Sequence, residues 1–308
     1  MLIVALLLVS CRPAASTPKA AIPRNAVATL SFLADIAQHV AGDRLQVSSL
    51  LPSGVDPHSY EPTPADVAKV ANCAVLIVNG AGLEAFLERL LRNVGGERLI
   101  IEASAGLVSR TVKEGEAVEQ EGEHEHEHEH EHEIDPHFWL DPNLAIRYVE
   151  NIRDGLSQAD PQGATVYAAH AAAYIAQLQE LDAWIREQVA QIPPERRLLV
   201  TNHESFGYFA DRYGLRIVGT IIPSVSTGAA PSAQQLARLV DAIRESGAPA
   251  IFLEMGSNPK LAQQLAQETG IKVVMDLYTH SLGTTSGEES GYMGMIRHNV
   301  KRIVEALR

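Results

Sequence analysis

The sequence predicts an α/β protein: two lobes of mostly parallel sheet flanked by helices, joined by one long rigid helix, with a metal in the interlobe cleft. Short runs rich in β-branched residues alternate with amphipathic stretches, which is the pattern of βα units. A long segment, 161–192, then keeps apolar residues at helical spacing and separates two sets of such units. Histidines follow several of the predicted strands, and these histidines indicate a metal-binding site.

The composition is that of a folded protein. Of its 308 residues 46% are hydrophobic, enough for one large or two medium domains. The net charge of -13 is local, because Lys113 to Asp135 holds 11 of the 38 acidic residues and one of the 25 basic ones. The remaining 27 acidic and 24 basic residues are nearly balanced, and nothing indicates nucleic-acid binding.

The first 11 residues are expected to form an export signal. Met1 to Ser10 is apolar but too short to span a bilayer as a lasting helix. It ends in Leu8-Val9-Ser10-Cys11, which resembles a bacterial lipobox and predicts a lipid on Cys11; a plain secretion signal is the alternative. Residues 12–25, rich in Pro, Ala, Ser and Thr, are expected to be a tether. With Cys11 lipidated, Cys73 has no disulfide partner and is expected in the core.

The N-terminal lobe is expected over residues 26–160. Its predicted strands are 27–32, 45–51, 75–79 and 99–101, and its predicted helices run through His39, from Pro64 onward, and over 85–93 and 143–157. The loop after the second strand carries Asp56-Pro57-His58, before a helix with Thr63 as N-cap and Pro64 at its first position. Asp135-Pro136-His137 repeats this motif in front of the apolar residues 138–140. Two such turns favour two metal ligands over two structural histidines.

Between these turns lies an insertion, 112–133, that is expected to be disordered without metal. Its histidines alternate with glutamates, a composition that holds divalent cations loosely: His124, His126, His128, His130 and His132. The alternative is a solvated acidic linker with no role.

The C-terminal lobe is expected over residues 193–308. Its predicted strands are 198–201, 216–221, 250–254 and 272–276, and its predicted helices are 202–213, 231–246, 259–268 and 291–307. His203 and His280 follow the first and last of these strands. Ligands of open α/β sheets gather at the carboxyl ends of strands. His58 and His137 from one lobe would therefore meet His203 and His280 from the other, whereas His39 and His170 lie within helices and are not expected to be ligands.

Several motifs together resemble the metal-specific solute-binding proteins of bacterial ATP-binding-cassette importers, the zinc and manganese group called cluster A-I. They are DPHSYEPTP at 56–64, NGAGLE at 79–84, DPHFWLDP at 135–142, TNHESFGYFADRYGL at 201–215, PSAQQLARLV at 231–240, IFLE at 251–254 and LYTHSLG at 277–283, beside the His-rich insertion. The resemblance implies two lobes joined by a long helix and places three ligands at His58, His137 and His203. The fourth ligand of the family is usually an Asp in a segment like TDSLG, where this chain has THSLG. His280 is therefore the expected fourth ligand, with Asp276 or water as the alternative.

An all-imidazole set favours Zn²⁺, because manganese prefers oxygen-rich sites and its binders in this family generally offer two carboxylates. Copper or nickel would bind at least as tightly in vitro. Four carboxylates are candidates for orienting the imidazoles, and the alternative is that they cap turns or face solvent: Asp56, Asp135, Glu61 and Glu254.

The expected function is capture of extracytoplasmic zinc and its delivery to a membrane permease with a cytoplasmic ATPase. The protein is expected to be a monomer, lipid-anchored at the cell membrane, or periplasmic if the lipobox is not used, and not an enzyme. A manganese- or iron-binding importer subunit is the alternative. A zinc hydrolase would need an open coordination position and a general base, and no HExxH-like motif is present. A third alternative is an adhesin or zinc buffer without a transporter, which a neighbouring permease gene would exclude.

Overall fold

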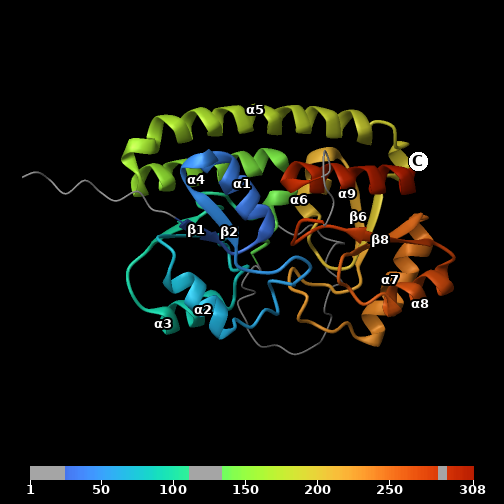
Figure 1. The fold of residues 1–308 in the computed structure, drawn as a ribbon. Helices are drawn as coiled ribbons and strands as arrows, with labels where there is room; N and C mark the ends of the chain where they lie inside the picture. The colour runs from blue at the N-terminus through green and yellow to red at the C-terminus, as the bar shows by residue number, and fades with distance from the viewer. Residues whose placement is uncertain (1–24, 111–133, 284–289) are drawn as a thin grey trace, which may run out of the picture.

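The computed structural model describes residues 25–110, 134–283 and 290–308. The predictions for Cys11, the tether and the insertion with its five histidines lie outside these residues. The described chain contains two four-stranded sheets, each entirely parallel (Figure 1). The predicted α/β class of two parallel sheets flanked by helices is confirmed.

The first sheet has the strand order β2-β1-β3-β4. Its strands are β1 (Asn25–Ala28), β2 (Gln46–Ser49), β3 (Val75–Val78) and β4 (Leu99–Glu102), and its helices are α1 (Ser31–Ala41), α2 (Pro64–Ala71), α3 (Leu87–Val94) and α4 (Pro142–Ala159). Thr63 caps α2 as predicted, accepting a hydrogen bond from the backbone N–H of Asp66. Every residue of β3 is buried, as expected for a central parallel strand.

The second sheet repeats this plan with the order β6-β5-β7-β8. Its strands are β5 (Leu198–Thr201), β6 (Arg216–Thr220), β7 (Ala250–Glu254) and β8 (Lys272–Leu277), and its helices are α6 (Gly207–Tyr213), α7 (Ala233–Ser246), α8 (Lys260–Thr269) and α9 (Gly291–Leu307). A separate apolar cluster fills this lobe between β5, β7, α7 and α8.

The long helix α5 (Ala164–Val189) runs along one side of both lobes (Figure 1). Its 26 residues span about 39 Å at 1.5 Å per residue. It packs against α1 and α4 of the first lobe and α9 of the second, through seven buried side chains: Tyr167, Ala171, Tyr174, Leu178, Leu181, Ile185 and Val189. These residues belong to one core that continues from the first sheet through α5 and α9. Because they share this core, both lobes are packed against the same helix, α5.

Two predicted element boundaries differ from the structure by more than three residues. The predicted strand 27–32 ends at Ala28, and its last two residues already belong to α1. The predicted helix 202–213 begins only at Gly207, because the backbone of 202–205 bonds elsewhere: Glu204 N donates to Ser224 O at 3.1 Å and Ser205 N to His203 O at 2.9 Å. His203 therefore lies on an irregular turn and not in a helix.

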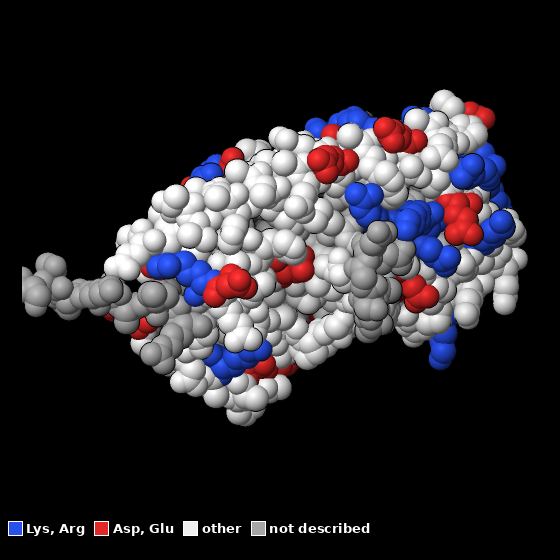
Figure 2. All heavy atoms as spheres, turned by 45° about the horizontal axis from the view of Figure 1, so that its top comes forward, with Lys and Arg blue, Asp and Glu red and all other residues white. Residues whose placement is uncertain are grey.

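The surface carries both signs of charge. On the face that Figure 2 shows, basic and acidic side chains are interspersed among large uncharged areas. Such mixing gives no single-sign field of the kind that attracts nucleic acid. Among the described residues, no helix is both long and apolar enough to cross a membrane.

Candidate metal centre

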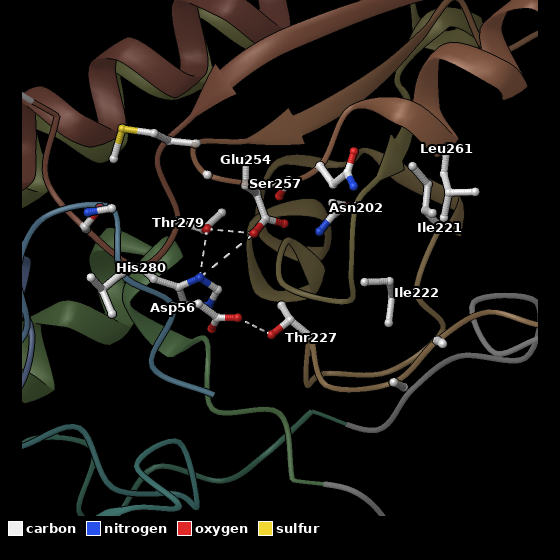
Figure 3. Close-up of a pocket in the computed structure, with 18 of the residues that line it drawn as sticks. Asp56, Asn202, Ile221, Ile222, Thr227, Glu254, Ser257, Leu261, Thr279 and His280 are labelled. Carbon is white, nitrogen blue, oxygen red and sulfur yellow. Dashed lines mark hydrogen bonds and ion pairs between the residues drawn. The ribbon is translucent and has the colours of Figure 1, made fainter. Parts of the chain in front are cut away.

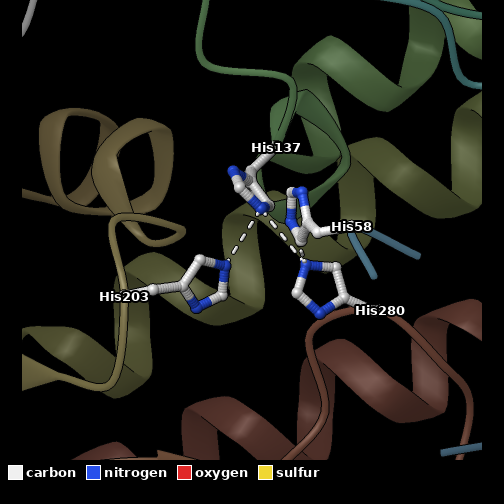
Figure 4. A group of neighbouring side chains, drawn as sticks. All are labelled: His58, His137, His203 and His280. Atoms are coloured by element: carbon white, nitrogen blue, oxygen red, sulfur yellow. Dashed lines mark hydrogen bonds between the residues drawn. The ribbon is translucent and has the colours of Figure 1, made fainter. Parts of the chain in front are cut away.

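Four histidines far apart in sequence converge at one point between the sheets (Figure 4). His58, His137, His203 and His280 each offer a ring nitrogen, and these nitrogens all lie within 4.8 Å of one another. The Nε2 atom of His137 is 3.2 Å from that of His203 and 3.2 Å from that of His280. The Nε2 atoms of His58 and His280 are also 3.2 Å apart. Four nitrogens at such spacing can act together as donors to one small cation.

The fold brings them together because three of them follow the carboxyl ends of strands. His58 lies in the loop after β2, His203 two residues after β5, and His280 three residues after β8. His137 precedes the short 3₁₀ turn Phe138–Leu140. The two sheets point these ends at each other, which is where α/β proteins gather ligands.

Buried partners orient three of the rings. His137 donates from Nδ1 to Asp135 Oδ1 at 2.8 Å, and His203 donates from Nδ1 to Glu254 Oε1 at 2.6 Å. Thr279 Oγ1 donates to Glu254 Oε2 at 3.0 Å, so it accepts from His280 Nδ1 at 3.2 Å. Each hydrogen bond fixes the tautomer that leaves the Nε2 lone pair facing the common point.

The other two carboxylate candidates have different roles. Asp56 Oδ1 accepts the backbone N–H of His58 at 2.9 Å and so holds the turn rather than the ring, while Asp56 Oδ2 accepts from the Thr227 hydroxyl of the other lobe. Glu61 is exposed and pairs with Arg89, away from the cluster. The side chain of Asp276 is exposed and is not part of the four-residue group.

The buried surroundings keep most of the rings neutral. Burial lowers the pKa of His58 to about 4 and the pKa values of His137 and His280 well below 6.5, and the neighbouring histidines add to the shift. His203 differs: burial is again the largest single effect and opposes its charged form, but the hydrogen bond and charge of Glu254 and the charges of Asp56 and Asp135 together outweigh burial and raise its pKa. Burial also raises the pKa of Asp135 to about 7. Neutral imidazoles have the free lone pairs that a metal requires.

An apolar wall supports the cluster, as the sequence 138–140 suggested. The Trp139 ring stacks on Phe32 with 4.6 Å between centroids and lies 5.2 Å from the ring of His137. Its Nε1 donates to Thr279 O at 2.7 Å, which ties the two lobes together beside His280. This contact and the role of Thr279 were not predicted, because nothing local in the sequence pairs residues 140 positions apart.

His39 and His170 are not part of the cluster. His39 is exposed on α1, where its Nδ1 lies 2.9 Å from Asp35 O, and His170 on α5 lies 3.3 Å from Val40 O.

Comparison with known proteins gives the family. A family model described as "Zinc-uptake complex component A periplasmic" (ZnuA) matches residues 26–306. The manganese-binding lipoprotein MntA of Halalkalibacterium halodurans is 34% identical over 281 residues, which cover 91% of this chain and 87% of the relative. The iron-binding protein YfeA of Yersinia pestis is 32% identical and covers 91% and 85%.

Among solved structures, the periplasmic zinc-binding protein TroA of Treponema pallidum aligns with a TM-score of 0.78 at 29% identity, covering 92% of this chain and 99% of that one. A manganese-bound periplasmic metal-binding protein of Candidatus Liberibacter asiaticus aligns with a TM-score of 0.78 at 26% identity and covers 92% and 100%. The family model covers every histidine of the cluster, and the two curated relatives each cover 91% of the chain. The chain therefore belongs to the ZnuA family of metal-binding solute-binding proteins of ATP-binding-cassette importers, cluster A-I.

Proposed function

We propose that this protein captures Zn²⁺ with His58, His137, His203 and His280 and delivers it to an importer. The observation that supports this most is the convergence of four Nε2 atoms, with three of their separations at 3.2 Å. A tetrahedral zinc ion with bonds of about 2.0–2.1 Å places its ligand nitrogens about 3.3 Å apart. The donor type and these three separations therefore support a closed four-nitrogen zinc site.

Manganese is the alternative cargo, since curated relatives are named for manganese and iron. The donor chemistry favours zinc. Among the described residues the converging group contains no carboxylate, and both nearby carboxylates are turned toward histidine Nδ1 atoms. Manganese prefers oxygen donors and higher coordination, whereas imidazole suits zinc. A zinc hydrolase is not favoured, because four histidines leave no open position on a tetrahedral ion.

The remaining parts of the proposal follow from family membership. The partner would be a membrane permease with its cytoplasmic ATPase, and the protein would act as a monomer held outside the cytoplasm by a lipid on Cys11, or free in the periplasm. We also propose that residues 26–160 and 193–308 act as the two lobes and 161–192 as their connection. Zinc-limited growth failure after deletion of the gene would support transport over a zinc buffer or an adhesin.

A titration tests the proposal directly. In the mature domain lacking Glu123 to Glu133, calorimetry with a competing chelator should show one tight zinc site and much weaker manganese binding, because the four imidazoles are retained. The full-length domain is the control and should differ only by additional weak sites. Loss of the tight site on deletion would show that the His/Glu segment is part of it. A preference for manganese would refute the assignment of zinc.

Zinc affinity should fall as the pH is lowered, in two stages. His203, whose pKa is raised above 6.5, is the first to be protonated and is more than half protonated at pH 6.5, so zinc binding at that pH should release protons. His58 resists protonation until about pH 4, so the steep loss of affinity should come well below 6.5. Chelator-competition titrations from pH 8 downward, with calorimetry in buffers of different ionisation enthalpy, measure both stages. Absence of proton release would contradict the state inferred for His203.

A further inference from the structure

A cavity of about 360 Å³ lies against the metal cluster on the side of His280 (Figure 3). Loops of both lobes line it: residues 54–56 from the first, and residues 227, 229–231, 254–258 and 279–281 from the second. Of the four histidines only His280 reaches it. The cavity is therefore a compartment beside the inner site, separated from it by the ring of His280.

One lining side chain offers hydrogen bonds to a polar ligand in the cavity. Asn202, next to His203, is only 8% exposed, and its side-chain amide makes no hydrogen bond within the part of the chain that the structure describes. Figure 3 includes it among the side chains drawn around the cavity. Its amide atoms are open to the cavity, so a water or a ligand there completes their hydrogen bonds.

The charge of the lining selects the sign of that ligand. Asp56 and Glu254 contribute carboxylates, and the described lining contains no Lys or Arg. Hydroxyl oxygens of Thr227, Thr279 and Ser257 add further acceptors. The volume suits a cation that keeps its water, because six waters at about 30 Å³ each occupy about 180 Å³.

We propose that this cavity is an outer binding site for a hydrated divalent cation, which waits there before it enters the four-histidine cage. The proposal rests on the proposed function, since its cargo is the same metal. Entry requires the His280 ring to turn. That ring is held by the Thr279 hydroxyl at 3.2 Å, whereas His137 and His203 are held by carboxylates at 2.8 and 2.6 Å. The ligand that borders the outer site is thus held by a hydroxyl, where His137 and His203 are held by carboxylates.

The test is the rate of zinc entry into the full chain after Asn202→Leu, which removes the amide but keeps the volume. Trp139, 5.2 Å from the His137 ring and 6.0 Å from the His280 ring, reports occupation of the inner site by its fluorescence in stopped flow. The association rate and the chelator-induced dissociation rate should both fall, by about tenfold, with the equilibrium Kd unchanged, because the outer site is empty in both end states. Asn93→Leu, at an exposed position of α3, is the matched control.

Unchanged rates in Asn202→Leu would overturn the proposal, and so would a weakened Kd with an unchanged association rate, which would make Asn202 a structural support of His203. A second measurement needs no variant. Magnesium keeps its waters and prefers oxygen, so it should occupy the outer site and slow zinc entry more than sodium chloride at the same ionic strength. Equal rates in the two salts would also overturn the proposal. Failure of the unaltered chain to bind zinc tightly would instead refute the proposed function.

Discussion

Replacing His280 by alanine is expected to weaken the tight zinc site by tenfold or more, at least about 1.4 kcal/mol of binding free energy. The substitution removes one of four nitrogen donors. In the unaltered chain, the Nε2 atom of His280 lies 3.2 Å from the Nε2 atoms of both His58 and His137. Water can fill the vacated position but binds zinc less well than a neutral imidazole. Calorimetry at neutral pH with a competing chelator measures the change.

Two further variants sharpen this result. His39→Ala, on the exposed face of α1, removes a histidine outside the cluster and should leave the affinity unchanged. His280→Asp introduces the residue that the sequence resemblance makes usual here, and its carboxylate oxygen should narrow the preference for zinc over manganese. A tight site indifferent to His280→Ala would mean an open three-histidine site, and both water and Asp276 would then have to be tested as the fourth ligand.

Zinc is expected to stabilise the fold by about 4 kcal/mol when free zinc exceeds its Kd by about a thousandfold. The four ligands come from separate segments of both lobes, so the unfolded chain cannot assemble the site.

The metal-free cluster also opposes folding at low pH. Because the folded-state pKa values of His58, His137 and His280 lie below 6.5, the stability present above pH 6.5 is lost as the pH falls toward those values.

Thermal unfolding of the domain lacking Glu123 to Glu133, with zinc and with excess chelator, measures this stabilisation. The His/Glu segment is removed because its histidines can bind zinc in the unfolded chain, which would reduce the difference in Tm between the zinc-bound and the metal-free protein. The His280→Ala variant should show a smaller shift in Tm. Equal Tm values with zinc and chelator would contradict a tight site that is formed only by the folded protein.

Much of the architecture could be read from the sequence because its signals are local. The period of the apolar residues predicted the long helix α5 to within three residues at each end, and strand β5 was predicted with the observed bounds, 198–201. The repeated Asp-Pro-His turns marked His58 and His137 as equivalent positions. Predicted element boundaries were wrong where a tertiary contact replaced a local one. At 202–206 the backbone hydrogen-bonds to Ser224, and α6 therefore begins only at Gly207.

By itself, the sequence determined which side chains follow the strands, since strand ends and turn residues are encoded within a few positions of each other. Only the tertiary structure decided what these side chains contact. It assigned Glu254 to His203 across 51 positions, excluded Glu61 by pairing it with Arg89, and enclosed His137 so that burial keeps its ring neutral. Hydrogen-bond partners and desolvation depend on distances between segments that no local pattern records, and for this reason the four-nitrogen cage and the cavity beside it appear only when the two lobes are packed on α5.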